Sequence, residues 1–321
     1  MPLARTTAVS AGEQLESLES ALSSVIRGKP EAIRMAVVCL LARGHLLIED
    51  VPGVGKTTLA HTLARALDCT FRRIQFTSDL LPSDVVGVTV YSTSSEEFDF
   101  KPGPVFANVL LADEINRTTP KTQSALLEAM NEGQVSIEGR SYPLPEPFMV
   151  IATQNPIEYH GTFPLPEAQL DRFLLRIEMG YPDATAEREI LGMNGSRQGP
   201  ETLEPALSAV EVIELQKAAQ EVRVEESVVD YLMRVVEATR EHERLALGVS
   251  PRGSMALYRA AQALALAEGL DFVTPDHVKR LAAHVFAHRV IADRRSAGDG
   301  RGAERGRLVV EEILSQVEVP L

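Results

Sequence analysis

The segment VPGVGKTT, residues 51–58, constrains the fold of this chain more than any other part of its sequence. It follows the apolar run HLLIE at 45–49 and precedes a segment with helical spacing at 57–67. A glycine-rich loop between a buried strand and a helix lets backbone N–H groups surround a phosphate, and the helix dipole adds to the attraction. The sequence therefore predicts a phosphate-binding loop inside an α/β fold.

The loop also assigns a task to individual side chains. Lys56 is expected to reach the β- and γ-phosphates of ATP, and the Thr57 hydroxyl is expected to bind Mg²⁺. Glycine allows the close backbone approach that a phosphate requires. The predicted ATP-binding residues are Pro52, Gly53, Val54, Gly55, Lys56, Thr57 and Thr58.

Asp50 departs from the full pattern G-x-x-x-x-G-K-T, because it stands where that pattern begins with glycine. Aspartate tolerates unusual backbone angles better than most residues, so the loop geometry is expected to survive. If the carboxylate lies near the β-phosphate, replacing Asp50 by Gly should tighten ATP binding by ~1 kcal/mol.

The segment VLLADEINR, residues 109–117, ends a predicted strand with two carboxylates. Asp113 is expected to hold Mg²⁺ through water, and Glu114 to orient or deprotonate the attacking water, a contribution of ~10²–10⁴ in rate. Many strands end in acids, so the alternative interpretation is a solvated pair in a loop. Arg117 fits either a nucleotide sensor or a structural salt bridge.

A third strand, in FMVIATQNP at 148–156, ends near Asn155. This side chain is placed to hydrogen-bond the attacking water or the γ-phosphate. The alternative is an ordinary turn residue before proline.

The chain divides by pattern near residue 183. Strand-like runs alternate with helical segments up to that point, with hairpins predicted at 86–100 and 134–144. Residues 184–321 are predicted to form a helical domain that no strand interrupts, with a loop at 294–306. Its predicted helices cover 206–222, 227–245, 253–268 and 275–288, and a last helix ends near Val317.

Composition narrows the function classes. The 321 residues have a net charge of −13 and only 5% aromatics, which disfavours a nucleic-acid partner. No apolar run approaches the length of a membrane span, and the acidic N-terminus is not a signal peptide. Cys39 and Cys69 are interpreted as small buried hydrophobes. We therefore expect a cytoplasmic protein without membrane insertion.

Several motifs together resemble the MoxR family of AAA+ ATPases over effectively the whole chain. They are the phosphate-binding loop, DEINR, ATQNP, LPEAQLDRF at 165–173 and GVSPRGSMAL at 248–257, in that order. The resemblance implies an AAA+ P-loop core of three αβα layers with a parallel sheet (1–183), followed by an all-α helical-bundle lid (184–321). The two hairpins are then the helix-2 insert and the pre-sensor-1 hairpin.

The resemblance also implies roles for three polar residues. Asn155 becomes sensor 1, Arg172 the arginine finger and Arg252 the sensor 2 arginine, acting within one subunit or across two. Arg172 has the alternative of an ion pair with Asp171 or Glu167, and Arg252 that of an ordinary surface arginine. The family resemblance further implies a Mg²⁺-dependent ATPase in a hexameric ring, whose clients carry von Willebrand factor A domains.

Three other functions are weighed against this one. A ring that translocates nucleic acid conflicts with the acidic charge, and residues 86–100 contain no Lys or Arg. A non-enzymatic nucleotide switch conflicts with intact Asp113, Glu114 and Arg172. The ATPase subunit of a metal chelatase remains a close alternative. His284 and His288 have a spacing that can bind metal, but a structural role is favoured because no third ligand is evident.

Overall fold

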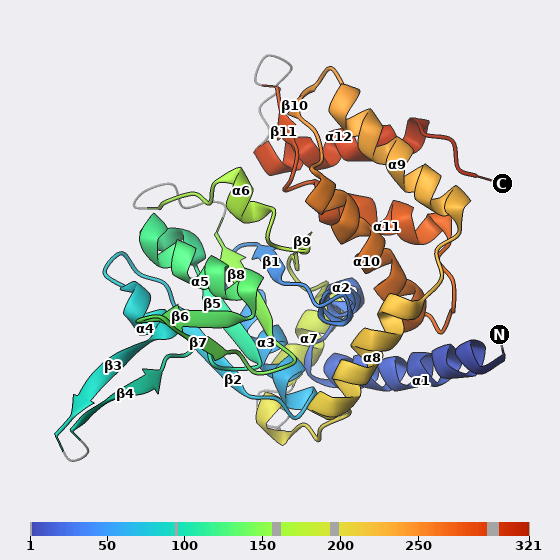
Figure 1. Cartoon of the computed structure of the whole chain (residues 1–321). Coiled ribbons are helices and arrows are strands. Elements are labelled where there is room, and N and C mark those ends of the chain that lie inside the picture. The colour runs from blue at the N-terminus through green and yellow to red at the C-terminus, as the bar shows by residue number, and fades with distance from the viewer. Residues whose placement is uncertain (1, 94–95, 156–161, 193–198, 294–301, 321) are drawn as a thin grey trace.

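A five-stranded parallel sheet forms the centre of the computed structural model (Figure 1), with strand order β2-β5-β8-β1-β9. The model describes residues 2–93, 96–155, 162–192, 199–293 and 302–320. The strands are β1 Leu46–Glu49, β2 Phe71–Gln75, β5 Val109–Asp113, β8 Met149–Gln154 and β9 Leu175–Ile177. Strands β1, β5 and β8 confirm the sequence prediction, whereas β2 and β9 were not predicted.

Helices cover both faces of the sheet, because its strands are apolar on both sides. Along β1, Leu46 and Ile48 enter one buried cluster and Leu47 enters the other. Helices α2 and α3 contribute to the first cluster and α5 to the second. The bounds are α2 Pro30–Leu41, α3 Lys56–Ala66, α4 Pro82–Val86, α5 Pro120–Glu132, α6 Glu167–Leu170 and α7 Ala184–Gly192. The predicted three-layer core is confirmed.

Two hairpins interrupt this core, at the positions that the sequence predicts. The first consists of β3 Gly87–Ser92 and β4 Glu97–Pro102, and it extends away from the sheet in Figure 1. The second consists of β6 Gln134–Ile137 and β7 Arg140–Pro143. The rings of Phe100 and Tyr142, 4.2 Å apart between centroids, connect the two hairpins.

Helices dominate the rest of the chain, as predicted. They are α8 Ala209–Glu221, α9 Glu226–Glu241, α10 Pro251–Ala267, α11 Pro275–Phe286 and α12 Gly302–Gln316. The expectation of no strand is wrong in one detail, because β10 Leu245–Leu247 pairs with β11 Ile291–Ala292. These strands are too short to give a sequence pattern. Of the predicted loop at 294–306, residues 294–301 lie outside the described part, and the remainder begins α12.

The N-terminal helix α1, Pro2–Val25, was not predicted from the sequence. Its buried side chains, Leu15, Leu18 and Leu22, enter the same cluster as the first face of the sheet. Helix α1 contacts α2 and α3 of the core and also α8 and α10. The division of the chain near residue 183 therefore stays a prediction, since α1 packs on both parts.

Candidate nucleotide-binding site

The carboxyl ends of the parallel strands bring the predicted motifs to one edge of the sheet. Glu49, at the end of β1, lies in register with Gln154 of β8, and Asp113 ends the neighbouring strand β5. The next residues along the chain are the phosphate-binding loop, Asn155 and Glu114. We call this edge, with residues 50–58, 113–114 and 155, the phosphate end. In open parallel sheets ligands bind at this edge.

The phosphate-binding loop has the backbone conformation that its glycines predict. Gly53 and Gly55 have φ values of +86° and +96°, which other residues rarely adopt, and a Cβ at Gly53 would meet no atom within 4 Å. Val54 is buried in the core, so its side chain anchors the loop and only its backbone is available to a ligand. The Lys56 ammonium donates to the Asp50 carbonyl at 2.7 Å. Burial lowers the pKa of Lys56.

Of the two positions considered for the Asp50 carboxylate, the geometry favours the one that supports the loop. One oxygen accepts from the Val51 amide at 2.8 Å. The other accepts from the amides of Met179 and Gly180 at 2.7 and 2.6 Å. The Asp50 carboxylate is thus turned toward Met179 and Gly180, which follow β9. Because these charge-assisted hydrogen bonds fix its position, Asp50 supports the loop instead of repelling the ligand.

The acidic pair at the end of β5 is held by a threonine that the sequence analysis missed. Thr153, fully buried in β8, donates its hydroxyl to one Asp113 oxygen at 2.6 Å. The same hydroxyl accepts from the Glu114 amide at 2.9 Å. Glu114 itself has a left-handed backbone with φ +55°. In the sequence, the only signal for this role was that polar Thr153 ends the otherwise apolar run FMVIAT.

Strand β2 supplies two further partners that the sequence analysis missed. Arg73 donates to the second Asp113 oxygen at 2.5 and 3.1 Å. The Gln75 amide donates to Glu114 at 2.8 Å, and Arg117 forms an ion pair with the same carboxylate at 2.9 Å. For Arg117, the structural salt bridge is thus present. Each of the two carboxylates, Asp113 and Glu114, therefore bonds to an arginine, and Glu114 also accepts from the Gln75 amide.

These residues fit a nucleotide with a divalent cation. The open space at Gly53 admits a phosphate close to the backbone, and Lys56 lies in the same loop. Asp113 already attracts the Arg73 guanidinium, as a cation-binding carboxylate should. Together with the Thr57 hydroxyl it provides the oxygen ligands that Mg²⁺ prefers. Asn155 is buried at the same edge.

The two predicted arginines lie at the other end of the sheet. His45, just before β1, contacts the Met130 carbonyl near the end of α5 through Nε2 at 3.1 Å. Arg252 donates to the next side chain, Asn131, at 2.7 Å. Arg172 donates to the Leu127 carbonyl of the same helix at 2.5 Å.

We call this edge, with Arg172, Arg252 and their partners on α5, the arginine end. The alternative ion pair of Arg172 with Asp171 is not formed, because Asp171 pairs with Arg289 at 2.7 Å. Arg252 is exposed in the first turn of α10. The roles of both arginines stay predictions.

The two histidines and the two cysteines occupy structural positions. His284 contacts the Arg176 carbonyl at 3.1 Å and His288 the Phe173 carbonyl at 3.0 Å. Cys39 is buried and Cys69 half-buried, and both are free thiols. Burial raises the pKa of Cys69 to about 11, so its reactive thiolate is disfavoured at neutral pH.

Comparisons with known proteins agree with this site. Residues 45–175 match a family described as "ATPase family associated with various cellular activities (AAA)", and 237–313 match an AAA lid domain. The uncharacterized protein YeaC of Bacillus subtilis is 49% identical over 94% of this chain and 93% of its own length. Chaperone MoxR1 of Mycobacterium tuberculosis is 44% identical over 96% of this chain and 83% of its own.

A solved structure gives the same result. The crystal structure of a candidate ATPase from Cytophaga hutchinsonii superposes with a TM-score of 0.90 and 36% identity, covering 100% of this chain and 99% of the other. Fold, phosphate end and family matches together define an AAA-type ATPase, which excludes the non-enzymatic switch. The chain belongs to the MoxR family of AAA+ ATPases.

Proposed function

We propose that this ATPase works as a homo-oligomeric ring, a hexamer, that couples ATP hydrolysis to the remodelling of a protein client. ATP then lies between neighbouring subunits. The phosphate end of one subunit binds it, and the arginine end of the next subunit completes the site. A finger supplied by a neighbour is typically worth ~10³–10⁵ in rate.

The separation of the two ends is the observation that supports this proposal. Strand β1 spans four residues, about 13 Å of extended chain, with the phosphate-binding loop after it and His45 before it. Arg172 and Arg252 bond to α5 near the helix end that touches His45. Neither side chain therefore lies beside its own loop. In this proposal Arg252 acts in trans, as Arg172 does.

At the phosphate end the proposal assigns one task to each group. Asp113 and Thr57 hold Mg²⁺, which supplies charge neutralisation on the phosphates when bound. Glu114 takes the proton of the attacking water or orients it, and Asn155 hydrogen-bonds that water or the γ-phosphate. Lys56 exchanges its bond with the Asp50 carbonyl for the phosphates.

A protein client is favoured by the exposed tip of the first hairpin. Tyr91 and Phe98 form a cross-strand aromatic pair and are 50% and 67% exposed. Exposed aromatic side chains of this kind mark interaction sites. One relative of this chain, from Mycobacterium tuberculosis, is named a chaperone. Following the family resemblance, we propose clients with a von Willebrand factor A domain, in the cytoplasm.

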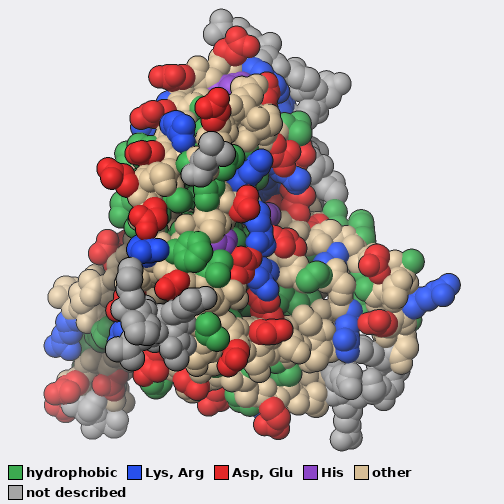
Figure 2. Space-filling model, turned by 90° about the vertical axis from the view of Figure 1, so that its right-hand side faces the viewer, with side chains coloured by type: hydrophobic (Ala, Val, Ile, Leu, Met, Phe, Trp, Pro, Cys, Tyr) green, Lys and Arg blue, Asp and Glu red, His purple; other side chains and the backbone are tan. Residues whose placement is uncertain are grey.

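The remaining alternatives are a nucleic-acid ring and a metal chelatase subunit. The first hairpin includes Lys101 in β4, so it contains one base beside Glu96, Glu97 and Asp99. Acidic side chains spread across the face in Figure 2, and the Lys and Arg side chains are interspersed among them. The net charge of the whole chain is −13. The acidic charge therefore favours a protein partner over nucleic acid.

No helix in the described part of the chain has the length and apolar character to cross a bilayer.

Mixing two inactive variants tests the shared site. Arg172→Ala should bind ATP and assemble but lose turnover by ~10³–10⁵, because the developing phosphate charge is not neutralised. Lys56→Ala should lose nucleotide binding yet keep an intact finger. In mixed rings some Arg172→Ala subunits meet a Lys56→Ala neighbour, and steady-state ATPase activity should partly return.

Mixed assembly is verified first, by co-purification of differently tagged subunits. Arg172→Lys serves as the matched control, because lysine keeps the positive charge of the side chain but lacks the planar guanidinium group with its paired N–H donors. Specific activity should also fall on dilution below the assembly range. Constant specific activity of a monomer, or no rescue at any mixing ratio, rules out the shared site.

A further inference from the structure

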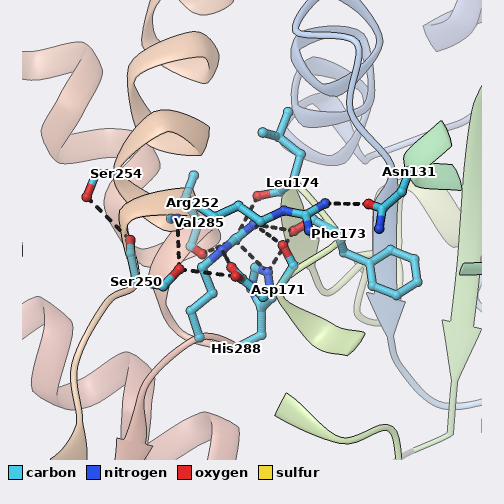
Figure 3. A network of polar contacts seen from close by, with 11 residues as sticks. Asn131, Asp171, Phe173, Leu174, Ser250, Arg252, Ser254, Val285 and His288 are labelled. Atoms are coloured by element: carbon cyan, nitrogen blue, oxygen red, sulfur yellow. Dashed lines mark hydrogen bonds and ion pairs between the residues drawn. The ribbon is translucent and has the colours of Figure 1, made fainter. Parts of the chain in front are cut away.

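A network of polar contacts around Asp171 and Ser250, outside the phosphate end, joins the residues before β9 to the start of α10 (Figure 3). A buried arginine, Arg289, contributes most of its bonds; it lies just after α11, and its side chain is 2% exposed. Its Nε donates to an Asp171 carboxylate oxygen at 2.7 Å. Its Nη2 donates to the carbonyls of Asp171 and Phe173 at 3.2 and 2.6 Å, and Nη1 to that of Leu174 at 3.1 Å.

These bonds hold the backbone on both sides of Arg172. The acceptor carbonyls belong to residues 171, 173 and 174, so the peptide groups around the candidate finger have a fixed position. The planar guanidinium presents its donors in a rigid fork, which makes such a clamp geometrically specific. Burial lowers the pKa of Arg289 to about 10, against the effect of Asp171, so the group stays charged at neutral pH.

The same carboxylate also holds the start of α10. The second Asp171 oxygen accepts from the Ser250 hydroxyl at 3.1 Å. Ser250 caps α10 by accepting from the Gly253 amide at 3.2 Å, and Arg252 lies between these two residues. Gly253 leaves room here, because a Cβ at this position would come within 2.6 Å of the Val249 Cγ1 and 3.0 Å of the Arg289 Cδ.

Arg172 and Arg252 both bond to α5, Arg172 to the Leu127 carbonyl and Arg252 to the Asn131 side chain. Burial lowers the pKa of Arg172 and the positive charge of Arg252 lowers it further, whereas Glu128 and Glu132 raise it. Two like charges near each other cost free energy, which an anion between them would offset. The clamp thus keeps two cations on one helix, where both can meet an anion.

We propose that the Asp171–Arg289 pair, with Ser250, is a positioning device that presents Arg172 and Arg252 as one unit to the phosphates of a neighbour's ATP. This inference rests on the proposed shared site. Stability alone does not require such a pair, because well-packed apolar residues are often as stable as a buried ion pair. A finger must instead be placed accurately, since a displacement of about 1 Å can cost ~10²-fold in rate.

Asp171→Asn tests the device without touching either arginine. The variant should bind a fluorescent ATP analogue and assemble as the unaltered protein does, while kcat falls ~10–100-fold through misplacement of the arginines. In mixed rings, Lys56→Ala should restore activity to Asp171→Asn, because it supplies an intact arginine end. Arg172→Ala should not restore it, because both variants then lack a working finger.

Arg176→Lys is the matched control, because Arg176 forms another buried pair, with Glu49 at 2.8 Å, beside the phosphate end. Any loss of activity in this variant should be restored by Arg172→Ala. Ser250→Gly is a milder second variant, since glycine keeps most of the cap, and it should behave as Asp171→Asn with a smaller loss.

Two outcomes overturn the inference while leaving the shared site intact. In one, Arg172→Ala restores activity to Asp171→Asn or Ser250→Gly. In the other, the folded variants turn over at the unaltered rate. Absence of rescue between Arg172→Ala and Lys56→Ala overturns the shared site itself, and this inference with it.

Discussion

The two ends of the central sheet differ in how their residues come together. At the phosphate end, a short loop and two strand ends supply the groups, each within a few consecutive residues. At the arginine end, the groups come from α5, residues 171–174, residues 250–253 and Arg289, which are distant in sequence. A local motif can specify the first kind of site. Only the complete fold assembles the second.

The ends also differ in charge. Asp113 and Glu114 are each engaged by a basic or amide group, from Arg73, Gln75 or Arg117. The arginine end instead holds two guanidinium groups near each other, with backbone and amide acceptors. One end suits a cation bound with phosphate, and the other suits the phosphate itself. Each end alone forms half of a nucleotide site, which is the physical basis of the ring proposal.

Beyond the mixing of Arg172→Ala with Lys56→Ala, the largest expected effect that separates the ends is at Glu114. Glu114→Gln keeps the hydrogen-bonding shape but removes the base, so hydrolysis should fall ~10²–10⁴-fold while ATP binding remains. Single-turnover hydrolysis and equilibrium binding of ATP, measured on the same preparation, separate the two effects. The ATP-bound ring should also capture its client in a pull-down.

Lys56→Ala is the control for this variant, since it should lose ATP binding and client capture together. Hydrolysis by Glu114→Gln at the unaltered rate under saturating ATP would show that Glu114 is not the catalytic group. The phosphate end would then not contain the catalytic group. The contrast between a catalytic site built from consecutive residues and an arginine end built from distant residues would no longer hold.

A smaller effect concerns pH and the buried His45, which contacts α5 beside the arginine end. His45 is buried, accepts from the Val150 amide through Nδ1, and burial lowers its pKa to about 4. The unfolded chain, with a His pKa near 6.5, binds the proton first. Stability from the neutral ring is therefore complete above pH ~6.5 and decreases toward pH 4, by up to ~3 kcal/mol.

The urea midpoint at several pH values between 4.5 and 7.5 measures this decrease. His45→Gln should lower the midpoint at pH 7.5 and flatten its dependence on pH, because glutamine does not titrate there. If the variant follows the pH profile of the unaltered protein, buried His45 is not the source of the decrease.

The phosphate end could be predicted from the sequence because its chemistry is written in consecutive residues. The strands β1, β5 and β8 are apolar runs that end at Glu49, Asp113 and Gln154, and the loop between β1 and α3 has a defined pattern. Both hairpins were also found. In the second hairpin the turn residues Glu138 and Gly139 have positive φ, as a tight hairpin turn requires.

Elements without a local pattern could not be predicted. Strand β2 contains Arg72 and Arg73, which interrupt an apolar run, and β9 has three residues. Their omission hid Arg73 and Gln75, the partners of the acidic pair. Arg289 lies in the sequence His288-Arg289-Val290, just after a helix, and nothing in that sequence distinguishes a buried arginine from a surface arginine. Its role depends on contacts across more than one hundred residues.

Asp50 provides the smallest effect, and it tests whether the phosphate end is as local as its motif. Asp50→Gly restores the usual first residue of the pattern, but it removes the acceptor for the amides of Met179 and Gly180. A hydrogen bond to a charged group contributes ~1.5–3 kcal/mol, so ATP affinity should weaken about tenfold as the loop loses support. Calorimetric titration with ATP measures the change. Asp84→Ala is the control, because it removes a similar carboxylate that accepts the Leu81 amide, away from the loop. Tighter binding by Asp50→Gly, with the fold intact, would place the carboxylate beside the phosphates after all. The phosphate end would then be specified entirely by its own motif.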